Sequence, residues 1–183
     1  VRPQVLFCDE DMFQKTGEWG QPVFKTRLNV DLLYSHNCVT HFLMVEKALI
    51  DRIGTSPEDV AGAQDYDLTL RCLSADARFE HVAHVLYHWR VHPGSTADGS
   101  ADSKPYAIEA GRLALQRHFN ALGICGTVED TETPFVYRMR YALPEPAPLV
   151  SIVIPTKDHV ETLDACVMSV SYTHLRAHET ELH

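Results

Sequence analysis

Three prolines at alternate positions, Pro144, Pro146 and Pro148, most constrain how this chain of 183 residues can fold. Proline fixes its own φ and disfavours a helix at the residue before it, so residues 143–148 predict a stiff, extended spacer. A new apolar run begins directly after the spacer. The chain is therefore expected to comprise an α/β unit over residues 1–142, a linker over 143–148 and the start of a second α/β unit over 149–170.

The segment over residues 171–183 differs from the rest of the chain. Residues 171–180 match one translated frame of a transposon-library sequencing adapter, and an unbroken match of this length argues against chance. Because Val1 is not a start methionine, the chain is expected to be an internal segment of a longer protein with a foreign tail. The tail is excluded from the predicted fold. A genuine His-rich terminus that binds metal is the alternative.

Composition argues against several classes of protein. With 45% hydrophobic and 22% charged residues, the chain is ordinary for a globular protein. No apolar run approaches the roughly 20 residues of a membrane-spanning helix. A net charge of −9 without a basic stripe argues against a nucleic-acid partner. The five cysteines are scattered and form no CxxC pair, so buried free thiols are expected rather than disulfides or a zinc cage.

The spacing of apolar residues predicts the secondary structure. Strands are expected over residues 5–8, 38–44, 82–90, 135–141 and 149–154. The first strand is expected to end in an acidic turn at residues 9–11. Helices are expected over residues 46–53, 68–73 with a cap near Asp65, 106–122, and after Asp158. The stripe of the third helix comprises Ile108, Leu115, Phe119 and Leu122.

The first candidate site is the acidic run Asp9, Glu10 and Asp11. Side chains at i and i+2 of an extended segment point the same way, so Asp9 and Asp11 can offer oxygens to one hard cation. A divalent ion held there could neutralise a leaving diphosphate. A solvated surface turn is the alternative, because charge runs are usually exposed.

The second candidate is the run Gln64-Asp-Tyr-Asp67 at a predicted helix start. A carboxylate in this place could take a proton from an incoming hydroxyl group. Helix capping explains the same residues equally well, since Asp65 can accept a backbone N–H and Asp67 favours the positive helix end.

The third candidate is the end of a predicted strand at His88, Trp89 and Arg90. It combines an imidazole that can bind metal, an aromatic face and a guanidinium that can bind phosphate. A structural histidine and a core tryptophan are the alternative.

Taken in order, these segments resemble the family 2 glycosyltransferases of the GT-A fold. The similarity is narrower to bacterial O-antigen and rhamnan-type enzymes with two glycosyltransferase domains in tandem, and it runs from about residue 5 to 170. It is carried by residues 8–11, 31–37, 62–68 with Arg71, 86–90, 94–97, 104–106, 137–141 and 150–158. The resemblance implies an α/β fold: the C-terminal part of a GT-A (nucleotide-diphospho-sugar transferase, Rossmann-like) domain, followed by the first βα unit of a second.

The resemblance also implies roles for individual residues. Asp9 and Asp11 match the DxD-type motif that binds metal and nucleotide-sugar, His88 matches a further metal contact, and the implied cofactor is Mg²⁺ or Mn²⁺. Asp65 matches the general base of inverting members. The implied substrate contacts are Gln64, Asp67, Trp89, Arg90, Thr156 and Asp158. Gln64 stands where many relatives carry an acid, so it cannot share the proton chemistry.

The function implied by the resemblance is transfer of a sugar from a nucleotide-sugar donor to a glycan or lipid-linked glycan acceptor. This step would serve cell-surface polysaccharide synthesis in the cytoplasm, with peripheral attachment to the inner membrane face compatible with it. The segment alone is expected to be inactive, because the leading nucleotide-binding strands and the second domain's acidic motif lie outside it. The alternatives are a non-catalytic module that binds carbohydrate or a partner protein, and a metal-dependent phosphohydrolase.

Overall fold

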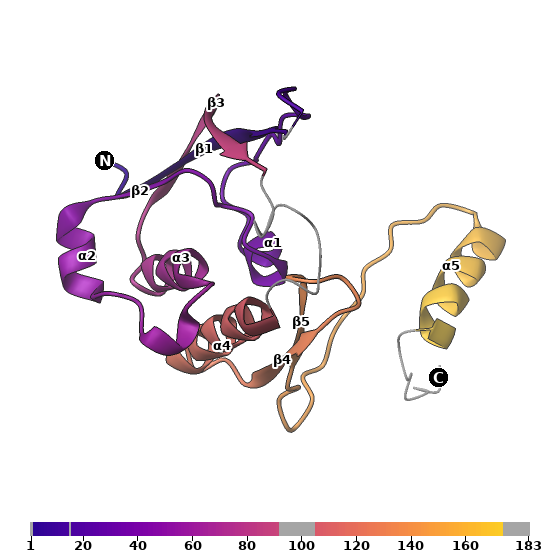
Figure 1. The fold of residues 1–183 in the computed structure, drawn as a ribbon. Coiled ribbons are helices and arrows are strands. Elements are labelled where there is room, and N and C mark those ends of the chain that lie inside the picture. The colour runs from indigo at the N-terminus through magenta and orange to yellow at the C-terminus, as the bar shows by residue number, and fades with distance from the viewer. Residues whose placement is uncertain (1, 15, 92–104, 174–183) are drawn as a thin grey trace. The chain divides into compact units, whose positions relative to one another are not determined.

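A computed structural model describes residues 2–14, 16–91 and 105–173 of the protein, without the side chains of 170–173. The chain divides into two compact units, Val1–Leu143 and Pro144–His183. The elements of the first unit are β1 (Val5–Phe13), α1 (Val30–Ser35), β2 (Leu43–Val45), α2 (Lys47–Ile53), the 3₁₀ helix η1 (Glu58–Val60), α3 (Gln64–Ser74), β3 (Phe79–Arg90), α4 (Pro105–Ala121), β4 (Gly126–Asp130) and β5 (Tyr137–Tyr141) (Figure 1). The second unit contains α5 (Val160–Thr173).

A small mixed sheet forms one layer of the first unit. Its strand order is β2-β1-β3, with β1 antiparallel to β2 and parallel to β3. A parallel pair needs a long crossover connection, and α1, β2, α2 and α3 lie in the connection between β1 and β3. A separate antiparallel pair joins β4 to β5. The expected α/β class is confirmed at this level.

The acidic run at residues 9–11 lies inside β1, so the expected turn is wrong. β1 continues to Phe13 because β3 supplies partners along this whole stretch, ending with Phe13 opposite Arg90. The register shifts on both sides of Asp9, as in a β-bulge. Strict alternation of the side chains is lost there, and Asp9 and Glu10 are both buried.

The core of the first unit lies where α1, α3, α4 and the β4–β5 pair meet the sheet. Its largest fully buried members are Phe7, Leu33, Leu70, Leu115 and Phe119. Burial of one such side chain contributes about 1.5–3 kcal/mol. A smaller cluster joins Val5, Leu49 and Cys72.

Helix α4 confirms the helix expected over residues 106–122, but its buried face only partly coincides with the expected apolar stripe. The buried positions are largely small residues, Ala107, Ala110, Gly111 and Ala114, which let neighbouring elements approach closely. Leu122 was placed on the buried stripe, yet it is 45% exposed. The reason is that α4 ends at Ala121 and the chain turns away at Gly123, whose φ is +67°.

All five cysteines are free thiols. Cys8 and Cys72 are buried as expected, whereas Cys125 and Cys166 are exposed. Burial raises the pKa of Cys72 to about 11, so this thiol is inert at neutral pH.

In the second unit, the buried strand expected over residues 149–154 is absent. Leu149 is 96% exposed and Val153 is 88% exposed. A strand satisfies its backbone groups only through a neighbouring strand, and the described residues of this unit offer none. Helix α5 follows Asp158 as expected.

Two further predictions fall on residues outside the described part. These are the 94–97 segment, which carries part of the resemblance, and the foreign tail from residue 174 onward.

Candidate functional site

A cavity of about 300 Å³ lies within the first unit where several elements end or begin. Its wall combines β1, the segment between α1 and β2, the start of α3, the end of β3, α4 and β5. The lining residues that carry polar or aromatic chemistry are Glu10, His36, Asn37, His41, Asp65, Tyr66, Trp89 and Tyr137. The cavity brings together the predicted base, Asp65, and the predicted substrate contact, Trp89.

Asp65 is the second residue of α3 and lies half-buried at the cavity wall. Its Oδ1 accepts the backbone N–H of Tyr66 at 2.9 Å. A negative charge in the first turn of a helix interacts favourably with the positive end of the helix dipole. Asp65 is not the capping residue of α3, because Ala63 holds that position without a side-chain cap. One Asp65 oxygen serves the backbone while the residue borders the cavity.

An aromatic group forms part of the same wall. The ring of His41 stacks on Tyr87, with centroids 5.1 Å apart, and lies at 4.5 Å from the ring of Trp89. Glu10 holds this loop to the sheet, since its Oε2 accepts the His41 N–H at 2.7 Å. The sequence analysis placed Glu10 within the acidic run but gave it no role of its own, and it did not single out His41.

Two buried polar atoms without a hydrogen-bond partner border this cavity among the described residues. Asn37 Oδ1 is buried without a hydrogen-bond partner, and so is His41 Nδ1, which lies 3.4 Å from Glu10 Oε2. Both residues line the cavity. A ligand with hydroxyl groups could satisfy atoms of this kind, because a hydroxyl both donates and accepts.

Asp9 and Asp11 lie outside this lining, and each pairs with a different histidine of β3. Asp9 Oδ1 accepts the Lys25 N–H at 2.8 Å and lies 2.7 Å from His81 Nε2. Burial raises the pKa of Asp9, but these contacts outweigh it and hold that pKa below its usual range. Asp11 Oδ1 lies 2.5 Å from His88 Nδ1.

These pairs test whether the predicted metal ligands fit one ion. The structure brings Asp11 and His88 together, whereas Asp9 is engaged by His81. Across residues 2–14, 16–91 and 105–173, no three His, Cys, Asp or Glu side chains converge as a metal site. Asp9 and Asp11 thus face different histidines in this arrangement, and the binding of Mg²⁺ or Mn²⁺ stays a prediction.

Lys25 is a buried cation on the other side of Glu10. Its Nζ donates to the carbonyls of Val39 at 3.0 Å and His41 at 2.6 Å, and it lies 3.8 Å from Glu10 Oε1. Burial lowers the pKa of Lys25, and the Glu10 carboxylate opposes that shift. Lys25 and Glu10 together fix the loop that carries His41.

The other predicted substrate contacts lie elsewhere. Gln64 begins α3 and uses its Oε1 to accept the Gly62 N–H at 2.8 Å. Arg90 ends β3 with an exposed side chain. Thr156 and Asp158 are exposed residues of the second unit.

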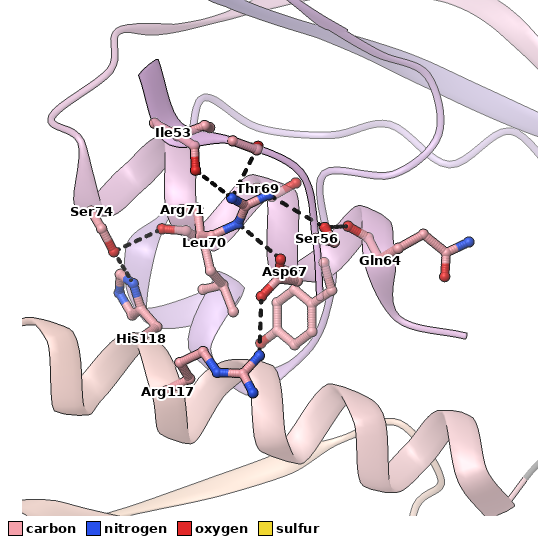
Figure 2. Close-up of polar contacts among 12 residues, drawn as sticks. Ile53, Ser56, Gln64, Asp67, Thr69, Leu70, Arg71, Ser74, Arg117 and His118 are labelled. Carbon is pink, nitrogen blue, oxygen red and sulfur yellow. Dashed lines mark hydrogen bonds and ion pairs between the residues drawn. The ribbon is translucent and has the colours of Figure 1, made fainter. Parts of the chain in front are cut away.

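Asp67 is buried, and Figure 2 shows it beside Arg71 of α3 and Arg117 of α4. Its Oδ2 accepts the Arg71 Nε–H at 2.9 Å, and its Oδ1 lies 4.0 Å from Arg117 Nη1. Asp67 lines a different cavity, of about 330 Å³, together with these two arginines. Its direct contacts are therefore with protein groups.

No family model matches the chain. The uncharacterized protein y4gI of Sinorhizobium fredii is 42% identical over 170 residues, which cover 91% of this chain. The O-antigen biosynthesis protein RfbC of Myxococcus xanthus is 34% identical over 166 residues, again 91% of the chain. The chain spans only 18% and 13% of the lengths of these two relatives. The similarity thus concerns one segment of much longer proteins.

Among the described residues, no helix is both long enough and apolar enough to cross a membrane.

Proposed function

We propose that this chain forms part of the active site of an inverting family 2 glycosyltransferase with a GT-A fold, acting in cell-surface polysaccharide synthesis. The observation that carries the proposal is the position of Asp65 on the wall of a cavity of about 300 Å³ that also contains Trp89 and His41. The name of the RfbC relative, O-antigen biosynthesis protein, supports the same class of product.

In the proposed reaction, an acceptor hydroxyl attacks the anomeric carbon of the donor sugar. Asp65 takes the hydroxyl proton as the new C–O bond forms, and the bond to the nucleoside diphosphate breaks. The electron pair of that bond leaves with the diphosphate. Because bond formation and cleavage occur on opposite faces, the configuration at the anomeric carbon inverts.

The rest of the cavity suits a sugar. Apolar C–H faces of a sugar pack on aromatic rings, and the Trp89 and His41 rings are available for this. Sugar hydroxyls can donate to the buried, unpaired Asn37 Oδ1. The proposed substrates are a nucleotide-sugar donor and a glycan or lipid-linked glycan acceptor.

The test is Asp65→Asn in the full-length protein, with UDP-, GDP- and dTDP-hexoses as donors. The amide keeps the size of the side chain but cannot take the proton, so transfer should fall by a factor of about 10²–10⁴. Donor affinity, measured by calorimetric titration, should remain within twofold of wild type. The matched control is Asp51→Asn, which removes an exposed carboxylate paired with Lys47 on α2.

Each outcome decides between functions. Near-normal transfer by Asp65→Asn would show that Asp65 is not the base. Release of inorganic phosphate without transfer would favour a phosphohydrolase. Donor binding without any turnover in the wild type would favour a non-catalytic binding module.

A further inference from the structure

The first turn of α3, which carries Asp65, lacks an N-terminal side-chain cap. The capping position is occupied by Ala63, and no side chain accepts a hydrogen bond there as a cap. A helix start leaves four backbone N–H groups without intrahelical partners, so an uncapped start is weakly held. Asp65 Oδ1 accepts the Tyr66 N–H within this turn, so the direction in which Asp65 points depends on what holds the turn as a whole.

Arg71 supplies contacts between α3 and the loop that follows α2. Its Nη1 donates to the carbonyls of Ile53 at 2.6 Å and Gly54 at 3.0 Å, and its Nε donates to Asp67 at 2.9 Å (Figure 2). The planar guanidinium can make these bonds at once, in a fixed geometry.

Ser56 extends the same network to the residue before Asp65. Its hydroxyl donates to the Gln64 carbonyl at 3.2 Å and lies 3.4 Å from Arg71 Nη2. The loop is thus tied to α3 at Gln64 and Arg71, which lie on either side of Asp65 in the sequence. Asp67 contributes by pairing with the Arg71 guanidinium within the helix.

Arg117 relates this network to α4. Its Nη2 donates to Asp59 of η1 at 2.7 Å, and its Nη1 lies 4.0 Å from Asp67 Oδ1. Helix α4 also supplies Ala107 and Gly111 to the wall of the cavity. The charges around Asp67 therefore connect the helix that carries Asp65 with the helix that supplies Ala107 and Gly111 to the same wall.

The arrangement separates two carboxylates that are only two residues apart. Residues i and i+2 of a helix do not share a face, and Asp65 lines the 300 Å³ cavity while Asp67 lines the 330 Å³ one. A buried carboxylate is costly unless it is paired, which makes the position of Asp67 dependent on Arg71.

We propose that Asp67 and Arg71 are positioning residues that fix the first turn of α3 and aim Asp65 into the cavity. This inference rests on the proposed function, because its consequence is a rate. A displacement of about 1 Å at a catalytic group can lower the rate about 100-fold. Substrate contacts made by other parts of the wall are not altered.

The experiment compares Asp67→Asn, Arg71→Lys and Ser56→Ala in the full-length protein. For the first two, kcat should fall roughly 100-fold while the KM values for donor and acceptor stay within about twofold. Arg71→Lys keeps the positive charge beside Asp67. If charge alone mattered, kcat would be preserved, whereas positioning requires the several N–H donors of the planar guanidinium. Ser56→Ala removes the two bonds to the Gln64 carbonyl and Arg71 Nη2 without leaving a buried charge, and a smaller fall in kcat, about tenfold, is expected from it.

The control variant is Glu129→Gln, which breaks the exposed pair between Glu129 and Arg140 on the β4–β5 hairpin. It should change neither kcat nor KM. Thermal unfolding of every variant shows whether it folds. If Asp67→Asn does not fold, Ser56→Ala still tests the positioning role.

The outcomes separate this inference from the proposed function. If Asp65→Asn is inactive while folded Arg71→Lys and Ser56→Ala both keep wild-type kcat, the positioning role is overturned and the base assignment stands. If Asp65→Asn keeps its activity, the proposed function fails, and this role fails with it. A fall in kcat with unchanged KM supports the positioning role.

Discussion

Replacing Gly111 in α4 by alanine is expected to destabilise the protein, although helix propensity favours the opposite. Alanine is better than glycine in a helix interior by about 1 kcal/mol. At this position, however, an added Cβ would contact the Tyr137 hydroxyl oxygen directly and its ring carbon Cζ at 2.9 Å. Helix and strand must therefore separate, or the Tyr137 ring must move.

The size of the effect follows from three contributions. Overpacking of a well-packed site costs about 1–3 kcal/mol. Movement of the ring also breaks the bond from the Tyr137 hydroxyl to the Ile108 carbonyl, 2.9 Å long, at about 1 kcal/mol. After subtraction of the propensity gain, the free energy of unfolding should fall by about 1–3 kcal/mol. The effect should be read from urea unfolding curves with an unchanged m value.

A double-mutant cycle tests the cause. Tyr137→Phe removes the clashing oxygen, so Gly111→Ala should cost less in that background than in the wild type, by about 1 kcal/mol or more. Both residues line the candidate cavity, so ligand binding should weaken in the single Gly111→Ala variant. A Gly111→Ala protein as stable as the wild type, or more stable, would refute the predicted contact.

Two further predictions concern pH and metal. Burial lowers the pKa of His118. Below about pH 6.5 the unfolded chain therefore binds more protons than the folded protein. The free energy of unfolding should decrease as the pH falls from about 6.5 to the lower pKa of the folded state. Burial also lowers the pKa of His36, so His118→Gln should remove only part of the pH dependence of the free energy of unfolding between pH 7.5 and 5.5. Urea unfolding measures this dependence, and the same dependence in the variant as in the wild type would contradict the prediction. If Asp9 and Asp11 hold Mg²⁺ or Mn²⁺, EDTA should abolish donor binding by the full-length protein, and the Asp11→Asn variant should bind donor weakly with or without metal. Donor binding that EDTA leaves unchanged would remove the metal role.

Elements with a long, regular pattern could be predicted from the sequence. The alternation over residues 82–90 gave β3, and the apolar spacing over 106–122 gave α4, each to within a few residues at its ends. Helix α1 was missed because it has only six residues, too short for a period, and its signal is the Asn29 cap, which accepts the Leu32 N–H at 3.0 Å. The strand at residues 149–154 was wrong because an apolar run specifies a strand only where another strand pairs with it.

The candidate site was predictable only in part, for a physical reason. Asp65 and Trp89 lie at the end of elements that the sequence located, and the structure places both on one cavity. Glu10 was part of the predicted acidic run but received no role, because strict alternation sets it opposite to Asp9 and Asp11, and the bulge at Asp9 breaks that alternation. His41 gave no signal, since its place depends on the long-range contact with Glu10.

The buried carboxylates of the first unit are each paired with a polar group of the protein. Asp9, Glu10 and Asp67 are buried, and each is compensated by groups far along the chain or on the next helical turn: His81 for the first, the His41 N–H for the second and Arg71 for the third. Apolar residues at such positions are often equally stabilising, so stability alone does not require the pairs. An apolar side chain, however, could not bond to a loop backbone in one fixed geometry. The Glu10 and Asp67 networks each tie a loop or helix start to its neighbour beside the cavity.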